Sequence, residues 1–193
     1  MGKLLEASNL GKRYGSRWLF HSLSLELAAG DYLVIRGANG SGKSTLVKAL
    51  AGLVEVTQGT VSWIGDRRLS LGYAALDMAV YPHLTPAEHL QMSAELRGLA
   101  SGPIPPGFGL ESCQNTRGSG LSTGQRMRLK MAIATQTQPS VLILDEPGAS
   151  LDEAGHGLVD RLIAEQLTRG CIVVATNNPA EGKGANLEIR LDD

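Results

Sequence analysis

One segment restricts the fold of this chain more than any other: Gly37-Ala38-Asn39-Gly40-Ser41-Gly42-Lys43-Ser44. It matches the pattern G-x-x-x-x-G-K-[ST] at every fixed position. The apolar run Leu33–Ile35 precedes it, and an amphipathic stretch follows it, so a strand, a loop and a helix are expected in that order. In this context the loop's backbone N–H groups and the positive end of the helix converge on phosphate oxygens. The segment predicts a nucleoside triphosphate site.

Two side chains of this loop have expected roles in phosphate binding. Lys43 supplies a positive charge to the β- and γ-phosphates, and the Ser44 hydroxyl can ligate Mg²⁺. The alternative is a glycine-rich turn with a surface lysine. The complete pattern and its strand–helix context favour the phosphate loop.

A second polar feature follows the apolar run Val141–Leu144, which is expected to be a buried strand. Asp145 and Glu146 come directly after it, and ligands of open α/β sheets bind at the carboxyl ends of strands. We expect Asp145 to hold Mg²⁺ and Glu146 to polarise the attacking water as a general base. An exposed Asp-Glu-Pro turn is the alternative, and the phosphate loop upstream disfavours it.

Periodicity and capping signals place the other elements and indicate an α/β fold with a largely parallel core sheet. Capping boxes begin two of the expected helices, and the Pro- and Gly-rich stretch Ser101–Gly109 is expected to be a loop on an inserted lobe. The expected strands are Leu4–Ala7, Trp18–Leu27, Tyr32–Arg36, Thr60–Ile64, Val141–Leu144 and Cys171–Ala175. The expected helices are Lys43–Leu53, Thr85–Arg97, Ser122–Thr137 and Glu153–Leu167.

Charge and apolar patterning exclude some classes of protein. Eighteen Lys and Arg against 19 Asp and Glu give a net charge of −1, which excludes a strongly basic nucleic-acid binder. No apolar run approaches the length that crosses a bilayer, and Cys113 and Cys171 form no metal or disulfide framework. We therefore expect a cytoplasmic domain in a reducing compartment, with any membrane role acting through a partner.

The segment Leu121-Ser122-Thr123-Gly124-Gln125, together with Gly37–Thr45 and Leu144–Pro147, resembles the ATP-binding-cassette (ABC) ATPases. The resemblance runs from about Leu4 to Ala175, and Thr123 stands where the family usually has glycine. It implies a P-loop NTPase-type fold with a mostly parallel core sheet, an antiparallel β subdomain and a small helical insertion. The expected domain spans 1–193, with a core of 1–75 and 122–193 and a helical lobe at about 76–121.

The resemblance also implies roles for individual residues. Tyr14 matches the aromatic residue that stacks on adenine, and Asp152 matches a position that communicates across a dimer, although it can equally be the N-cap of Glu153–Leu167. The signature residues that would contact the ATP of the other monomer are Ser122, Thr123, Gly124 and Gln125. The implied ATP-binding residues are Tyr14, Gly37, Asn39, Gly40, Ser41, Gly42, Lys43, Ser44 and Thr45.

Domains of this family work as head-to-tail pairs that sandwich two ATP molecules, so the resemblance implies a homodimer or a paired ABC subunit using ATP and Mg²⁺. It also implies a transmembrane permease subunit that holds the domain at the inner face of the membrane. The stretch Tyr81–Glu88, within the lobe Leu76–Gly120, resembles the segment that faces such a permease. No direct membrane insertion and no nucleic-acid partner are expected.

Two positions depart from the family pattern. Asn177 stands where the family usually has a histidine that contacts the γ-phosphate, and Leu76 stands where it usually has a metal-binding glutamine. Asp77 is a substitute candidate for the metal. An amide donates a hydrogen bond but carries neither a proton nor a charge, so we expect ATP binding with slow or partner-dependent hydrolysis, with Glu146, Lys43 and Asn177 as the catalytic set. The short chain and Thr176-Asn177 resemble the ATP-binding subunits of haem exporters in cytochrome c maturation.

Three alternatives stay open at this point. One is a nucleotide-binding regulatory subunit with impaired hydrolysis, which Asn177 and Leu76 favour and Glu146 opposes. Another is a non-transport ABC protein, although the chain has neither heptads nor a second phosphate loop. A P-loop kinase is disfavoured by the signature. Outside the site, Cys113 is expected to be a loop thiol, and Arg126, Arg128 and Lys130 are expected to form a solvated helix face.

Overall fold

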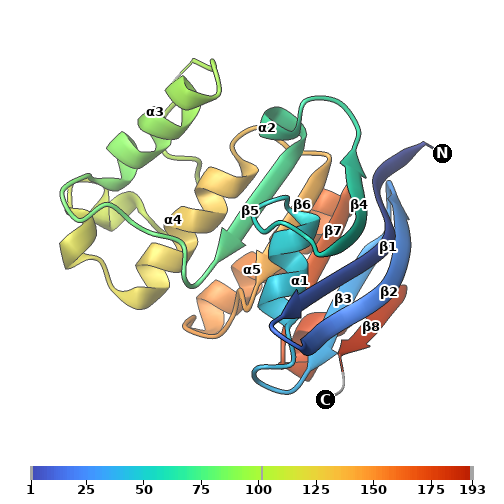
Figure 1. Ribbon diagram of the computed structural model, residues 1–193. Helices are drawn as coiled ribbons and strands as arrows, with labels where there is room; N and C mark the ends of the chain where they lie inside the picture. The colour runs from blue at the N-terminus through green and yellow to red at the C-terminus, as the bar shows by residue number, and fades with distance from the viewer. Residues whose placement is uncertain (1, 101, 192–193) are drawn as a thin grey trace.

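A computed structural model describes residues 2–100 and 102–191 (Figure 1). Its centre is a five-stranded parallel sheet with the strand order β5-β6-β7-β3-β8. A three-stranded antiparallel sheet with the order β2-β1-β4 covers one side of it. The strands are β1 (Lys3–Tyr14), β2 (Arg17–Ala28), β3 (Tyr32–Gly37), β4 (Gln58–Trp63), β5 (Leu71–Ala75), β6 (Val141–Asp145), β7 (Cys171–Ala175) and β8 (Leu187–Leu191).

Helices cover both faces of the parallel sheet. α1 contacts β3, β6 and β7 from the side of the antiparallel sheet, whereas α4 and α5 pack on the opposite face (Figure 1). The α-helices are α1 (Lys43–Leu50), α2 (Arg67–Ser70), α3 (Pro86–Leu96), α4 (Thr123–Thr135) and α5 (Glu153–Leu167). The 3₁₀ helices are η1 (Glu111–Cys113), η2 (Gly118–Gly120) and η3 (Pro179–Gly182).

The central strands are apolar throughout because both of their faces are covered. In β6, Val141 and Ile143 belong to the core beneath the antiparallel sheet, and Leu142 and Leu144 belong to the core beneath α4 and α5. Successive side chains of a strand point to opposite faces, so one short run serves two cores. The expected α/β fold with a mostly parallel core sheet and an antiparallel subdomain is confirmed.

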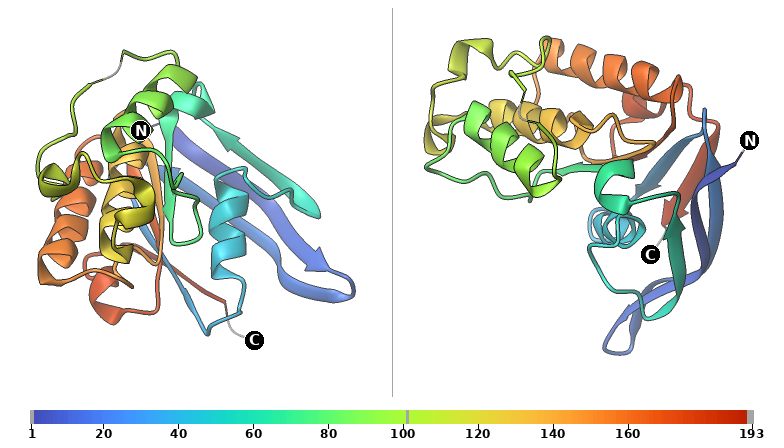
Figure 2. Two further views of the ribbon diagram at one scale, coloured as in Figure 1. Left: turned by 90° about the vertical axis from the view of Figure 1, so that its left-hand side faces the viewer. Right: turned by 90° about the horizontal axis from the view of Figure 1, so that it is seen from above.

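Helix α3 packs on α4 and stands away from the antiparallel sheet, as the right-hand view of Figure 2 shows. Thr85 caps α3 and Ser122 caps α4, each through a reciprocal capping box, as the sequence predicts. Residues 102–109 form the expected loop, and Ser101 lies outside the described residues. Within the described ranges no helix is long and apolar enough to cross a membrane.

Some elements differ from the sequence prediction. The prediction omitted β5, α2 and β8, and it extended α1 to Leu53, which is exposed. Gly52, with φ of 65°, ends α1 because its left-handed backbone turns the chain away before Leu53 reaches the core. β8 was missed because it lies at the edge of the sheet, where the residues of Leu187–Leu191 are mostly exposed and show no continuous apolar run.

The expectation of a solvated face on α4 was wrong. Lys130 is buried and donates a hydrogen bond to the Leu76 carbonyl (2.5 Å), while Arg126 donates to two carbonyls that precede α4. These cations supply hydrogen bonds to backbone carbonyls of the lobe. Cys113 is likewise buried rather than a loop thiol, since η1 carries it into the core beside α4.

Candidate active site

The phosphate loop runs from the end of β3 into α1, as predicted. Gly42 is the N-cap of α1 with φ of 103° and without a side-chain cap, so the first N–H groups of the helix face the loop's hollow. A Cβ on Gly37 would lie 2.3 Å from the Leu191 carbonyl oxygen and 2.5 Å from Ser41 Oγ. Any side chain at position 37 would clash with the Leu191 carbonyl of β8 and with the Ser41 hydroxyl of the loop, so this position requires glycine.

Lys43 lies folded against this loop. Its ammonium donates hydrogen bonds to the carbonyls of Gly37 (2.9 Å) and Ala38 (3.2 Å), and it lies 3.8 Å from Glu146 Oε1. A cavity of about 290 Å³ opens here between the loop and Glu146. Its lining residues are Leu19, Asn39, Gly40, Gly42, Lys43, Ser44, Thr45 and Glu146.

Asp145 is a buried carboxylate at the end of β6, with 5% of its surface exposed. Burial raises the pKa of Asp145, and the Glu146 and Asp77 carboxylates add to this, while hydrogen bonding to Ser44 opposes it. Its Oδ1 has no hydrogen-bond partner among the described residues. An ionised oxygen in this position is stabilised when a cation binds it.

The burial of Asp145 leads to a stability prediction. Because its pKa is raised in the folded state, the ionised form opposes folding, and stability should increase as the pH falls toward that raised pKa. Asp145→Asn is expected to stabilise the nucleotide-free protein by about 1 kcal/mol, or about 3 °C in Tm, near pH 8. The substitution should also make Tm depend less on pH. Calorimetry of both proteins between pH 5 and pH 8 measures this, and a lower Tm for the variant at pH 8 would contradict it.

Glu146 adopts a left-handed backbone conformation, with φ of 49°, immediately after β6. Its N–H donates to the Ala175 carbonyl (2.8 Å), and its Oε2 accepts from the backbone N–H of Asn177 (3.4 Å). A non-glycine residue in this region is strained, and the neighbouring strand β7 maintains the strain. The result is a carboxylate aimed at the cavity beside Lys43.

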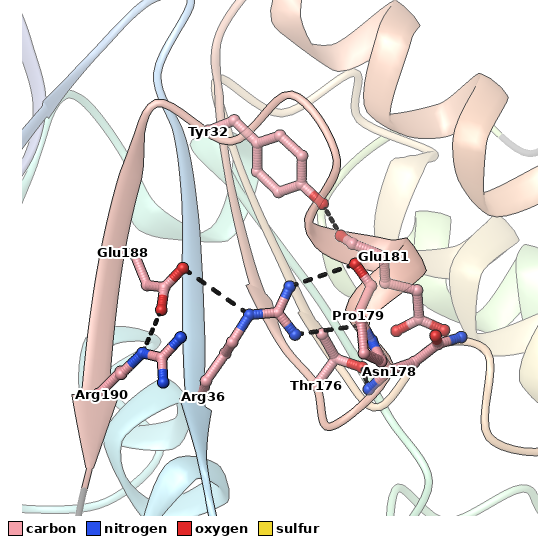
Figure 3. A network of polar contacts seen from close by, with 8 residues as sticks. All are labelled: Tyr32, Arg36, Thr176, Asn178, Pro179, Glu181, Glu188 and Arg190. Atoms are coloured by element: carbon pink, nitrogen blue, oxygen red, sulfur yellow. Dashed lines mark hydrogen bonds and ion pairs between the residues drawn. The ribbon is translucent and has the colours of Figure 1, made fainter.

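Asn177 contacts both the phosphate loop and Glu146. Its side-chain amide donates to Asn39 Oδ1 in the phosphate loop (2.6 Å), while its backbone contacts Glu146. Directly after Asn177, the carbonyls of Asn178 and Pro179 accept hydrogen bonds from Arg36 at the end of β3 (3.2 and 3.4 Å; Figure 3). The structure therefore brings together Lys43, Ser44, Asp145, Glu146 and Asn177, which lie in three separate parts of the sequence.

Several predicted residues are not part of the cavity lining: Tyr14, Gly37, Ser41, Asp77, Asp145 and Asn177. Tyr14 is exposed at the end of β1, with the Lys12 ammonium 4.9 Å from its ring centroid. Asp77 is paired with Lys48, and its role at the metal stays a prediction. Leu19 of β2 was missed; it lines the cavity against Gly42, and an apolar residue in a strand carries no sequence signal for such a role.

Three signature residues, Ser122, Gly124 and Gln125, line a second pocket of about 460 Å³ that shares no lining residue with the first; Thr123 is not part of its lining. Ser122 and Gln125 cap α4, and a Cβ on Gly124 would lie 3.0 Å from the Ser150 carbonyl oxygen. Asp152 caps α5 through the Gly155 N–H (2.9 Å) and pairs with Arg128 (2.5 Å); these contacts lower the pKa of Asp152. The N-cap role is confirmed, and communication across a dimer stays a prediction.

A glycine-rich loop at the carboxyl edge of a parallel sheet, facing a buried carboxylate, defines a P-loop nucleoside triphosphatase. The sequence model of the ABC transporter family matches residues 20–149, and the chain belongs to that family. It is an ABC-type ATPase subunit.

Relatives and solved structures agree with this assignment. The cytochrome c biogenesis ATP-binding export protein CcmA 2 of Cupriavidus metallidurans is 34% identical over 98% of this chain and 96% of its own length. The CcmA protein of Hyphomonas neptunium is 33% identical over 97% and 96%. The solved ATP-binding subunit of an ABC transporter is 28% identical, with a TM-score of 0.80 over 93% of this chain and 81% of that one. These comparisons favour the transporter ATPase over the regulatory and non-transport alternatives.

Proposed function

We propose that this chain hydrolyses ATP as a head-to-tail dimer and drives a separate membrane subunit of an export-type ABC transporter. One observation carries the proposal: the predicted phosphate-binding residues and the signature residues lie in two separate pockets of the described residues. The first holds the phosphate loop and Glu146, and the second holds the signature at the N-terminus of α4. A two-fold pairing would place the signature of each chain on the phosphate-loop cavity of the other.

The second pocket has the chemistry to bind the far side of a γ-phosphate. Helix α4 is 13 residues long, and its first N–H groups lie beside Gly124, where a side chain would meet Ser150. In the single chain, Ser122 Oγ accepts the Gln125 N–H (3.1 Å). A phosphate oxygen would supply further acceptors for the remaining N–H groups of the helix end.

The residues present fit Mg²⁺ bound together with ATP. No group of three His, Cys, Asp or Glu side chains within residues 2–100 and 102–191 could hold a metal alone. Asp145 with its unpaired Oδ1 and the hydroxyl of Ser44 would serve, since Mg²⁺ takes few protein ligands and completes its shell with phosphates and water. When bound, the ion would neutralise charge on the phosphates.

Hydrolysis then depends on Glu146 and Asn177. Glu146 is held by the Asn177 backbone and directed into the cavity, where it can accept a proton from a water next to the γ-phosphate. The Asn177 amide would donate one hydrogen bond to a phosphate oxygen after leaving Asn39. A neutral donor stabilises developing charge less than a charged one does, so slow turnover is expected.

Asn177→His is accordingly expected to raise the turnover rate by about threefold to tenfold, because a protonated imidazole donates a stronger, charge-assisted hydrogen bond. The measurement is phosphate release at saturating Mg·ATP between pH 6 and pH 8, with Asn177→Ala as the matched loss of the amide. The gain should be largest at low pH, where the imidazole is protonated. An unchanged rate for both variants would show that Asn177 does not contact the phosphate.

The membrane partner is proposed from the lobe at about 76–121 and from the relatives. Tyr81 is 53% exposed, and its backbone N–H donates a hydrogen bond to Nε2 of the buried His89 (2.9 Å). This hydrogen bond fixes the backbone that carries the exposed aromatic side chain. Such a residue suits a protein interface. The CcmA relatives are named for export in cytochrome c biogenesis, so we propose a permease of that system, with the chain peripheral on the inner face of the membrane.

Complementation between two inactive variants tests the dimer. Lys43→Met would disable the phosphate loop, and Gly124→Arg would disable the signature, so each homodimer should be inactive. In the mixed dimer, the intact loop of one chain faces the intact signature of the other. Because half of the dimers in an equal mixture are mixed and one of their two sites works, about a quarter of the wild-type rate is expected.

Two controls make this test decisive. Both variants should keep the wild-type circular dichroism spectrum and melt cooperatively, which shows that inactivity is not unfolding. A chain carrying both substitutions, mixed with the Lys43→Met chain, should stay inactive because no intact loop is present. No recovered activity in the primary mixture, with both variants folded, would overturn the head-to-tail arrangement.

A further inference from the structure

A cavity of about 570 Å³ lies away from both pockets proposed for the nucleotide. It opens between α5 and the segment that follows Asn178, and it shares no lining residue with the other two pockets. This volume is typical of small-molecule sites. The proposed ATP chemistry uses none of its residues.

Glu181 in η3 lines the cavity, although only 5% of its surface is exposed. Its Oε2 is fully buried and has no hydrogen-bond partner within the described ranges. Oε1 lies 2.0 Å, and His156 Nδ1 2.9 Å, from the position that a Cβ on Gly148 would take. The carboxylate and the imidazole therefore converge on one point beside Gly148.

The backbone around Glu181 is fixed. The Tyr32 hydroxyl donates a hydrogen bond to the Glu181 carbonyl, and Arg36 holds the preceding carbonyls (Figure 3). Burial raises the pKa of Tyr32 to about 12, with the Glu181 charge adding to the effect, so the phenol stays a donor. A buried carboxylate oxygen such as Glu181 Oε2, without a donor among the described residues, costs free energy unless a donor is supplied.

The cavity walls define what kind of ligand would supply that donor. Val159, Ile163 and Leu167 form an apolar stripe along α5, since they recur every four residues. The charged groups that line the cavity are Glu181, Asp160, Lys183 and, when protonated, His156. Two carboxylates disfavour an anion, and no trio of metal-ligating side chains was found among the described residues.

From this geometry we infer that the cavity is a binding site for a small organic cation: a protonated amine whose ammonium donates to Glu181 and whose alkyl chain lies along α5. An ammonium offers three donors, enough for the Glu181 carboxylate and for a second acceptor. An apolar chain of about six carbons would cover the stripe of α5 and remove it from water.

Three probes with one alkyl chain and different head groups test the inference: hexylamine, hexanol and hexanoate. Each is titrated into the whole ¹⁵N-labelled chain, and amide shifts are followed by NMR. Hexylamine is expected to shift amides around Glu181, Gly184 and Ala164 and to bind at least about tenfold more tightly than hexanol. Hexanoate should not bind there. Equal binding of hexylamine and hexanol, or no shifts with hexylamine, would overturn the proposal.

Matched variants locate the contacts. Glu181→Gln keeps the shape of the side chain and should weaken hexylamine binding about tenfold while leaving hexanol unchanged. Glu165→Gln, on the same helix α5 but outside the cavity lining, should change neither. If Glu181→Gln fails to fold, Ala164→Trp, which starts from an exposed wall position, should abolish binding by filling the cavity. Unchanged hexylamine affinity in either folded variant would refute the site.

A further probe separates a free amine from a lysine side chain of a protein. Nα-acetyl-lysine methylamide carries the same ammonium on a branched backbone. We expect it to bind more weakly than hexylamine. Binding of this peptide mimic without binding of hexylamine would contradict a small-molecule site.

Discussion

Glu146→Gln is expected to lower the rate of ATP hydrolysis by about 10²- to 10³-fold while ATP binding stays intact. The glutamine keeps the shape of the side chain but cannot accept a proton. The substitution also retains an acceptor for the Asn177 N–H, so the geometry of the cavity should be preserved. Single-turnover phosphate release at high protein concentration, with Mg·ATP below the enzyme concentration, measures the chemical step directly.

The same substitution, Glu146→Gln, should leave ATP binding intact. Because ATP would bind without being hydrolysed, Glu146→Gln should accumulate as an ATP-bound dimer, which light scattering with and without Mg·ATP detects. Glu165→Gln, an exposed carboxylate on α5, should hydrolyse and dimerise like the wild type. A Glu146→Gln rate equal to that of the wild type would remove Glu146 as the general base and leave the ATP site unaffected.

Lys43→Met should weaken Mg·ATP binding by about 10²-fold or more. In the structure the Lys43 side chain is 6% exposed and its ammonium donates hydrogen bonds to two loop carbonyls, so it is already held beside the predicted phosphate loop. Removing it would leave the phosphates without a charge-assisted donor in a largely buried position, and each such hydrogen bond contributes about 1.5–3 kcal/mol. Isothermal titration with Mg·ATP gives the change in Kd.

The controls separate binding from folding. Lys3→Met removes an exposed lysine that pairs with Glu26 and should leave Kd unchanged. Lys43→Met itself is expected to fold, since methionine fills the volume of the lysine stem without a buried charge. A folded Lys43→Met protein that binds Mg·ATP with wild-type affinity would show that the loop carbonyls, and not phosphates, are the functional partners of this lysine.

Local signals predicted several elements closely. The helix Glu153–Leu167 and the strand Cys171–Ala175 have the bounds expected from their patterns, and the capping boxes at Thr85 and Ser122 are present. Each of these depends on neighbours within about four residues. Elements that depend on distant partners were missed: β5 and β8 are strands only because β6 and β3 pair with them.

The candidate site likewise has features that local sequence predicts and features that depend on distant contacts. Sequence alone predicted the chemistry of the site: a phosphate loop with Lys43, a carboxylate pair after a buried strand, and an amide at position 177 where the resembled family usually has an imidazole. These are local patterns, and their residue types follow from what phosphates and metal ions require.

Only the tertiary structure decided how these groups act together. Asn177 reaches both Asn39 and Glu146, Lys130 is buried and bonded to the Leu76 carbonyl, and Glu181 lines a cavity beside α5. Such contacts join residues as much as 138 positions apart. They exist because parallel strands bring their carboxyl ends to one edge of the sheet, an arrangement that sheet pairing produces and that no short pattern encodes.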